Sequence, residues 1–144
     1  MGSVGLSDII VTPLSRIATD GGDVMHALKN NDPEYGGFGE AYFSWLEHRK
    51  VKAWKCHTEM TMNLIVPFGQ VKFVFCDLDS QSNVFRIEEI GVNNYARLTV
   101  PPGVWFGFQG LKVNSSLVLN IADIPHDPLE VRRLSGPEIN YNWS

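Results

Sequence analysis

Lys55, His57 and Glu59 occur at alternate positions of one short run, and all three side chains can carry charge or exchange protons. Side chains alternate between the two faces of a β-strand, so a strand here would place all three on one face. Such a face is poorly suited to a packed core. It is either exposed to solvent with at most a surface ion pair, or it lines a polar cavity such as the mouth of a barrel.

Further polar side chains interrupt runs that are otherwise apolar or aromatic. Asn63 follows His57 with the same parity, and Asn120 interrupts an apolar run. Tyr42 belongs to an aromatic-rich run from Glu40 to Trp45. A buried asparagine must find hydrogen-bond partners, so each asparagine marks either a functional site or a structural bridge.

Most of the chain between residues 39 and 122 reads as short β runs separated by turns. Val71 to Leu78 is the strongest of these runs, and a loop is expected at Asp79 to Asn83. Many short strands at this spacing predict an all-β sandwich or barrel. The other expected strands are Glu40 to Trp45, Val51 to Thr61, Asn63 to Val66, Val84 to Ile90, Ala96 to Val100 and Ser116 to Ala122.

The two ends of the chain differ from this central part. Residues 1–20 form an N-terminal segment, and residues 20–38 are rich in glycine and predict an irregular arm. The tail, residues 125–144, contains a short helix-like stretch from Pro128 to Arg133 that Asp127 could cap. Its final aromatic residues are expected to pack across the barrel. We therefore expect one domain over residues 1–144.

Composition narrows the classes of function. The 144 residues carry 12 Lys and Arg against 16 Asp and Glu, a net charge of −4, which argues against a nucleic-acid partner. The sequence has no apolar run of membrane-spanning length and no signal peptide. Cys56 and Cys76 form no disulfide framework. A cytoplasmic protein with no membrane partner is expected.

Two segments resemble a cupin barrel: His57 with the downstream Gly69, and Pro101-Pro102-Gly103. Many cupins hold a transition metal with a His-x-His pair in the first segment and a histidine three residues after the glycine of the second. Here Lys55 and Phe106 occupy those histidine positions. One imidazole with these neighbours is not a plausible transition-metal site, so no metal and no other cofactor are expected.

A more specific resemblance is to the dTDP-4-dehydrorhamnose 3,5-epimerase family, metal-free cupins that act on nucleotide-linked 4-keto sugars. The resemblance spans about residues 20 to 143 and implies a jelly-roll barrel with an N-terminal arm. A shorter subgroup with the motifs V-K-x-W-x-x-H-x-E-M-T-x-N and P-P-G-V-W-x-G-F is still more similar. The matching segments are Asp77 to Ser82, Val100 to Phe108, His57, Pro125 to Trp143 and, for the subgroup, Val51 to Asn63 and Pro101 to Phe108.

The resemblance implies the roles of particular residues. In the family a histidine removes a proton next to the ketone, a C-terminal carboxylate orients this histidine, a lysine stabilises the enolate, and a tyrosine returns a proton on the opposite face. His57 matches the histidine. The family's lysine position falls near Met62 or Asn63, its tyrosine position near Leu119 or Asn120, and its carboxylate position near Glu138 or Asn140.

Lys55 and Tyr42 are the expected replacements for the missing lysine and tyrosine. With His57 they form the predicted catalytic set of an epimerase or isomerase for a dTDP- or other nucleotide-linked 4-keto-6-deoxy sugar. With one proton-transfer group matched, we expect reaction at one centre rather than two. The expected substrate-binding residues are Glu59, Asn63, Asn120, Trp105 and Arg97, and the candidate cations for a diphosphate are Lys55, Lys72, Arg86 and Arg97.

Two alternatives remain open at this point. The chain could be a catalytically incomplete cupin that binds a sugar or nucleotide sugar, or a metal-free cupin with an unrelated lyase or isomerase reaction. Lys55 and Tyr42 distinguish the first alternative from the epimerase, since an enzyme needs both to face the cavity that holds His57. The resemblance also implies a homodimer.

Overall fold

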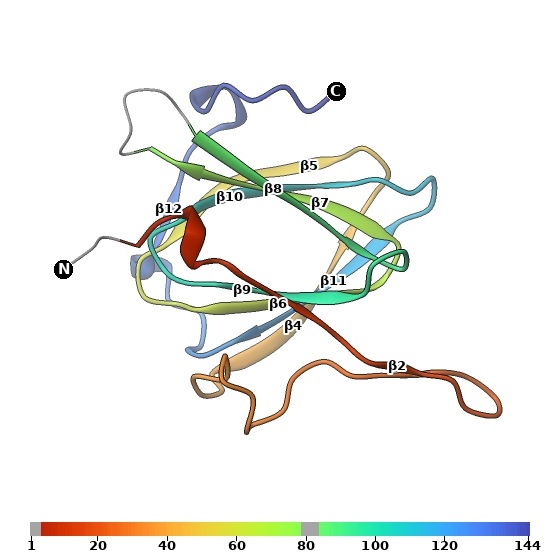
Figure 1. Ribbon diagram of the computed structural model, residues 1–144. Helices are drawn as coiled ribbons and strands as arrows, with labels where there is room; N and C mark the ends of the chain where they lie inside the picture. Colours follow the sequence, from red (N-terminus) through yellow and green to blue (C-terminus); the bar gives the residue numbers. More distant parts are fainter. Residues whose placement is uncertain (1–3, 79–83) are drawn as a thin grey trace.

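Two five-stranded antiparallel sheets face each other in the computed structural model, which describes residues 4–78 and 84–144 (Figure 1). The first, the β4 sheet, has the order β1 (Ile10–Pro13), β9 (Ala96–Val100), β6 (Met62–Phe68), β11 (Ser116–Ala122) and β4 (Glu40–Leu46). The second, the β5 sheet, has the order β12 (Val131–Arg133), β5 (Val51–His57), β10 (Trp105–Gly110), β7 (Gln70–Asp77) and β8 (Val84–Gly91). This arrangement is the jelly-roll barrel that the sequence predicts.

Short elements lie outside the two sheets. β2 (Arg16–Ile17) and β3 (Val24–Met25) form a two-stranded ribbon in the N-terminal arm. Single 3₁₀ turns occur at η1 (Leu6–Asp8), η2 (Pro128–Glu130) and η3 (Gly136–Glu138). No helix in the described ranges is long and apolar enough to cross a membrane.

The core lies between the sheets and follows from side-chain alternation. On β7, Val71, Phe73 and Phe75 face inward and are completely buried. Val74 and Cys76 face outward from the same strand and belong to a second apolar cluster. A strand buried on both faces explains why this run has so strong a β signal in the sequence.

The C-terminal segment covers the outer face of the β5 sheet, as Figure 1 shows. Trp54 is buried there, and its indole N–H donates to the carbonyl of Gly136 at 3.1 Å. The rings of Tyr141 and Trp143 pack on Trp54 at 6.4 and 5.3 Å. The expected packing of the tail through its aromatic residues is confirmed.

Sequence and structure differ in two strands of the barrel. β10 was not expected as a strand because its glycines weaken the β pattern, yet it lies at the centre of the β5 sheet. Gly107 is required there, since a Cβ would come within 2.6 Å of the Cβ of Ala53. β1 draws part of the N-terminal segment into the β4 sheet by pairing with β9. The loop expected at Asp79 to Asn83 lies outside the described residues.

Gly69 joins β6 to β7 with a φ of 88°, in the left-handed region. A Cβ at this position would lie 2.7 Å from the Cα of Ser116. Gly69→Ala should therefore lower the free energy of unfolding by about 2 kcal/mol or more, because both the backbone angle and the contact are unfavourable. Urea unfolding measures this loss.

Gly136→Ala is the matched control, since a Cβ there meets no atom within 4 Å. Its free energy of unfolding should stay within about 0.5 kcal/mol of wild type. Equal stability of the two variants would contradict the described turn.

Candidate active site

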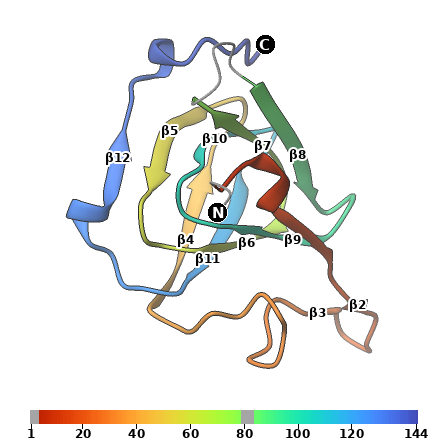
Figure 2. The same ribbon diagram turned by 60° about the vertical axis from the view of Figure 1, so that its left-hand side comes forward.

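A cavity of about 420 Å³ opens between the two sheets, within the size range of small-molecule sites. Its walls come from the inner faces of both sheets and from β12, which runs beside β5 at the edge of the barrel (Figure 2). The lining residues that carry polar groups are Tyr42, Ser44, Lys52, Lys55, His57, Asn120 and Arg133. The sequence left open whether the Lys55 and His57 face was exposed or lined a cavity, and the structure shows a cavity.

His57 ends β5 with its ring in the cavity wall and only 6% of the residue exposed. Its Nδ1 lies 2.5 Å from Oε1 of Glu130. A carboxylate bound at Nδ1 fixes the orientation of the imidazole and places the proton of the neutral ring on Nδ1. The Nε2 atom is then available to accept a proton.

Glu130 is 1% exposed and is held by the backbone as well as by His57. Its Oε2 accepts hydrogen bonds from the backbone N–H groups of Glu59 and Met60, both at 3.1 Å. Burial raises the pKa of the Glu130 carboxyl, but the hydrogen bonds from His57 and the two amides outweigh it and hold the pKa below its ordinary value. Glu130 is therefore a fixed negative charge behind the imidazole.

The position of Glu130 corrects the sequence analysis, in which Glu138 or Asn140 was the nearest carboxylate counterpart. Glu138 is exposed, and its Oε2 instead accepts a hydrogen bond from the backbone N–H of Ser135. Asp127 caps η2 as expected, by accepting from the backbone N–H of Leu129 at 3.0 Å. The helix-like stretch is shorter than predicted, because the chain turns after Glu130 into β12.

β12 pairs with the end of β5, and this pairing holds Glu130 next to His57. Val131 lies opposite His57 in the ladder, and the N–H of Thr58 donates to the carbonyl of Glu130 at 2.8 Å. A lone glutamate before a three-residue strand gives no periodic signal. The one sequence feature that could have pointed to Glu130 as the partner of His57 is its charge, in a tail expected to pack on the barrel.

Three cations meet at the cavity: Lys52, Lys55 and Arg133. Alternation alone would place Lys52 and Lys55 on opposite faces. The β5–β10 ladder shifts its register between Phe106 and Gly107, so β5 contains an extra residue there and both lysines line the cavity. Burial first, and then the charges of Arg133 and Lys52, lower the pKa of Lys55.

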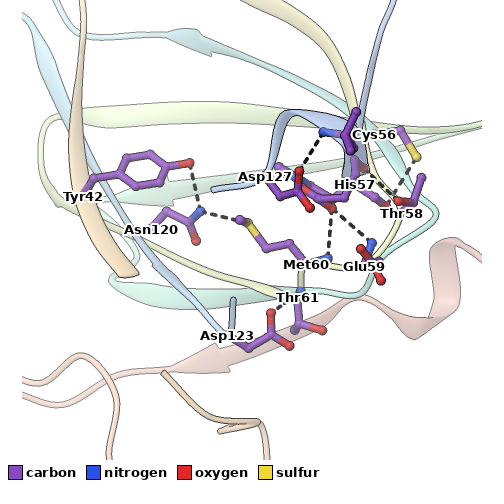
Figure 3. Close-up of polar contacts among 12 residues, drawn as sticks. Tyr42, Cys56, His57, Thr58, Glu59, Met60, Thr61, Asn120, Asp123 and Asp127 are labelled. Carbon is purple, nitrogen blue, oxygen red and sulfur yellow. Dashed lines mark hydrogen bonds and ion pairs between the residues drawn. The ribbon is translucent and has the colours of Figure 1, made fainter. Parts of the chain in front are cut away.

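Tyr42 and Asn120 face the cavity from the β4 sheet, where they are directly paired on β4 and β11. The Nδ2 of Asn120 donates to the Tyr42 oxygen at 3.1 Å and contacts the Met60 sulfur at 3.9 Å (Figure 3). The structure therefore brings Tyr42, Lys55 and His57, the predicted catalytic set, to one cavity.

Four of the expected substrate-binding residues do not line this cavity. Glu59 is exposed beyond the end of β5, where the strand alternation no longer applies. Asn63 faces outward and accepts a hydrogen bond from Thr99. Trp105 also faces outward, into the cluster around Trp54. The four residues are Glu59, Asn63, Trp105 and Arg97, so Asn120 is the one expected substrate-binding residue that lines the cavity.

Three of the candidate diphosphate cations serve elsewhere in the described structure. Arg97 is buried under the N-terminal arm, with Nη2 2.7 Å from a carboxylate oxygen of Glu34. Arg86 donates to the backbone carbonyls of Leu6 and Ile9. Lys72 lies over the rings of Tyr141 and Trp143. Lys55 is the one of the four that reaches the cavity, and Lys52 and Arg133 were missed.

Phe106 stacks on the His57 ring, with centroids 6.0 Å apart and planes 17° apart. It covers the imidazole on one face and offers no metal ligand. Across residues 4–78 and 84–144, no group of three or more His, Cys, Asp and Glu side chains could hold a metal ion. The polar groups of the described site are instead an imidazole backed by a buried carboxylate, three cations, a phenol and an amide.

Comparison with solved structures finds the same fold in enzymes of nucleotide-sugar metabolism. A dTDP sugar isomerase from Desulfovibrio desulfuricans G20 is 37% identical, with a TM-score of 0.88 over 94% of this chain and 90% of that chain. QdtA, a sugar 3,4-ketoisomerase from Thermoanaerobacterium thermosaccharolyticum in complex with TDP, is 18% identical, with a TM-score of 0.75 over 90% of each chain.

A dTDP-4-dehydrorhamnose 3,5-epimerase from Sulfolobus tokodaii is 19% identical, with a TM-score of 0.79 over 97% of this chain and 84% of that chain. At such identities the likeness to the ketoisomerase and the epimerase concerns the fold. A scan against protein-family models and a search of curated proteins find no match.

Replacing the buried carboxylate tests the geometry around His57. Glu130→Gln should lower the free energy of unfolding at pH 7 by about 2 kcal/mol or more, because it removes a charged hydrogen-bond partner from the interior. Because the folded-state pKa of Glu130 is lowered, its stabilisation is present above the unfolded value near about 4.3 and is lost as pH falls through the folded value.

The difference between wild type and Glu130→Gln should therefore shrink on acidification, as measured by urea unfolding at several pH values. Glu138→Gln is the control for a carboxylate of the same segment that is exposed. It should change stability by less than about 0.5 kcal/mol. A difference for Glu130→Gln that is the same at every pH would be the contrary result.

Proposed function

The chain belongs to the dTDP-sugar isomerase and dTDP-4-dehydrorhamnose 3,5-epimerase family of cupins, and we propose that it epimerises or isomerises a dTDP-linked 4-keto-6-deoxy sugar. The observation that carries this proposal is the buried His57–Glu130 pair in the wall of a substrate-sized cavity. A proton next to a ketone is weakly acidic, so its removal needs a positioned base and a positive group near the developing oxyanion. His57 and Lys55 supply these two groups.

In the proposed reaction the Nε2 atom of His57 accepts the proton from the carbon next to the ketone. The electron pair of the broken C–H bond passes to the ketone oxygen and forms an enolate. Lys55, on the same strand, stabilises the enolate charge. Glu130 stabilises the imidazolium that forms, since a buried carboxylate already lies 2.5 Å from Nδ1.

The substrate class is supported by the charge of the cavity. Lys52 and Arg133 are exposed at its opening, and the three cations lie close enough for repulsion to contribute to the lowered pKa of Lys55. An anionic ligand relieves this repulsion. A diphosphate near Lys52 and Arg133 would leave Lys55 beside His57 for the sugar.

We also propose that the protein is a cytoplasmic homodimer without a metal or other cofactor. Phe43, Trp45 and Phe68 expose more than half of their surface, and Trp45 packs edge-on against Phe68 at 6.5 Å. Exposed aromatic groups of this kind favour a protein contact. Sedimentation as a monomer at micromolar concentration would contradict the dimer.

Deuterium exchange tests the proposed chemistry. Wild type with dTDP-4-keto-6-deoxyglucose in D₂O should incorporate deuterium next to the ketone, as followed by NMR. His57→Asn should reduce this rate by about 100-fold or more while dTDP affinity changes only a few-fold, because a positioned base contributes about 10²–10⁴ in rate. Lys55→Met should slow the exchange.

His126→Asn is the control, since it removes an exposed imidazole away from the cavity. Exchange at the wild-type rate in His57→Asn would show that His57 is not the base. If wild type binds dTDP sugars but exchanges no 4-keto sugar, the protein is a binding module with an incomplete catalytic set.

Calorimetric titration with dTDP tests the role of the cations at the opening. Arg133→Met should weaken dTDP binding by about three- to tenfold, because it removes a charge-assisted contact to a phosphate at a partly exposed site. The effect should diminish in high salt. Lys112→Met is the control, because Lys112 is exposed and lies outside the cavity lining. This variant should bind dTDP as wild type does. An equal loss of affinity in both variants would contradict a phosphate subsite at Arg133.

A further inference from the structure

Asn120 contributes a buried side-chain amide to the cavity wall, with 2% of the residue exposed. It lies on β11, directly opposite Tyr42 on β4, and both belong to the β4 sheet. His57 and Lys55 belong to the facing β5 sheet. A ligand in the cavity therefore has His57 on one side and the Tyr42–Asn120 pair on the other.

The contacts of Asn120 fix the direction of its amide. Its Nδ2 lies 3.1 Å from the Tyr42 oxygen and 3.9 Å from the Met60 sulfur. Figure 3 draws both contacts as dashed lines. A thioether sulfur has no proton and can only accept, so the NH₂ group is the one that faces Met60. The same NH₂ group donates to Tyr42, and the phenolic proton of Tyr42 is therefore directed away from Asn120.

The other end of the amide has no such partner. The Oδ1 of Asn120 is buried and accepts no hydrogen bond from any group in the described parts of the chain. Buried side-chain acceptors are rarely left without a donor in native structures, and those that are point to a role in binding or catalysis. An acceptor in the wall of a ligand cavity is suited to a hydroxyl or N–H donor of the ligand.

We propose that Asn120 positions the substrate and the acid of the reaction together. Its Oδ1 accepts a hydrogen bond from a hydroxyl of the sugar ring, and its Nδ2 holds the Tyr42 oxygen so that the O–H points at the ring. Tyr42 then donates its proton to the enolate carbon on the face opposite His57. This inference rests on the proposed function and assigns the second proton transfer.

The proton balance of this sequence closes without any co-reactant. His57 gains the proton of the broken C–H bond, and a new C–H bond forms with the proton of Tyr42. The substrate loses one proton and gains one, so it is neither oxidised nor reduced. His57 is left protonated and Tyr42 deprotonated, and exchange with water restores both.

The affinity of dTDP-glucose relative to that of dTDP tests the hydrogen bond to the sugar. The ratio of these two affinities is independent of any change in how the nucleotide part binds. Asn120→Leu should reduce this ratio by about tenfold, the loss expected for a buried hydrogen bond. Asn63→Leu is the matched control, because it removes a buried amide from the outer face of the same sheet and should leave the ratio unchanged.

Comparing deuterium exchange with product formation tests the proton donor. Tyr42→Phe should keep at least a tenth of the exchange rate, which His57 supplies, and lose about 100-fold in product formation. Asn120→Asp should bind dTDP-glucose as wild type does, yet lose product formation, because a carboxylate accepts from the phenol and turns its proton away from the ring.

The outcomes separate this inference from the proposed function. An unchanged affinity ratio in Asn120→Leu, or product formation at the wild-type rate in Tyr42→Phe, overturns the role of the pair while wild-type exchange still supports the proposed function. Absence of exchange in wild type overturns the proposed function, and the affinity ratio then still tests the contact between Asn120 and the sugar.

Discussion

The hydrogen bond between the buried carboxylate of Glu130 and Nδ1 of His57 is the interaction on which the rest of the site depends. A carboxylate in a protein interior is costly unless its oxygens are fully engaged. Here one oxygen faces His57 and the other accepts two backbone N–H groups at the end of β5. The path of the chain after β5 and the register of β12 are both constrained by this one side chain.

The barrel places chemically different groups on its two layers. The β5 sheet, with β12 at its edge, carries His57, the proposed base, beside the buried Glu130 and the cations of the cavity. The β4 sheet carries Tyr42 and Asn120. A 4-keto sugar between the sheets can lose a proton to one layer, and the planar enolate that forms can receive a proton from the other. The jelly roll itself therefore provides the two-sided access that an inversion requires.

Much of the fold could be predicted from the sequence because alternation and turn residues are local signals. The runs at β4, β7, β8, β9 and β11 were recognisable for this reason. The cavity could be predicted only in part: Lys55 and His57 share a face within one strand, but the shift in the β5–β10 register that adds Lys52 depends on pairing between distant segments.

The residues that were missed are those that tertiary contacts alone bring to the site. Glu130 lies 73 positions from His57 in the chain, and no short-range pattern links the two. Arg97 and Asn63 were misjudged for the opposite reason, since they are buried polar residues whose partners belong to the N-terminal arm and to the neighbouring strand. A polar residue in an apolar run indicates a partner, but the sequence does not say whether that partner is a ligand or the protein itself.

A crystal structure with dTDP-glucose, which has no ketone and cannot react, tests the central claim most directly. The account predicts that C3 or C5 of the hexose, the carbons that flank C4, lies within about 3.5 Å of Nε2 of His57, a distance suited to proton transfer. The diphosphate should lie at Lys52 and Arg133. A sugar bound outside the cavity, or with C3 and C5 both facing away from His57, would contradict the account.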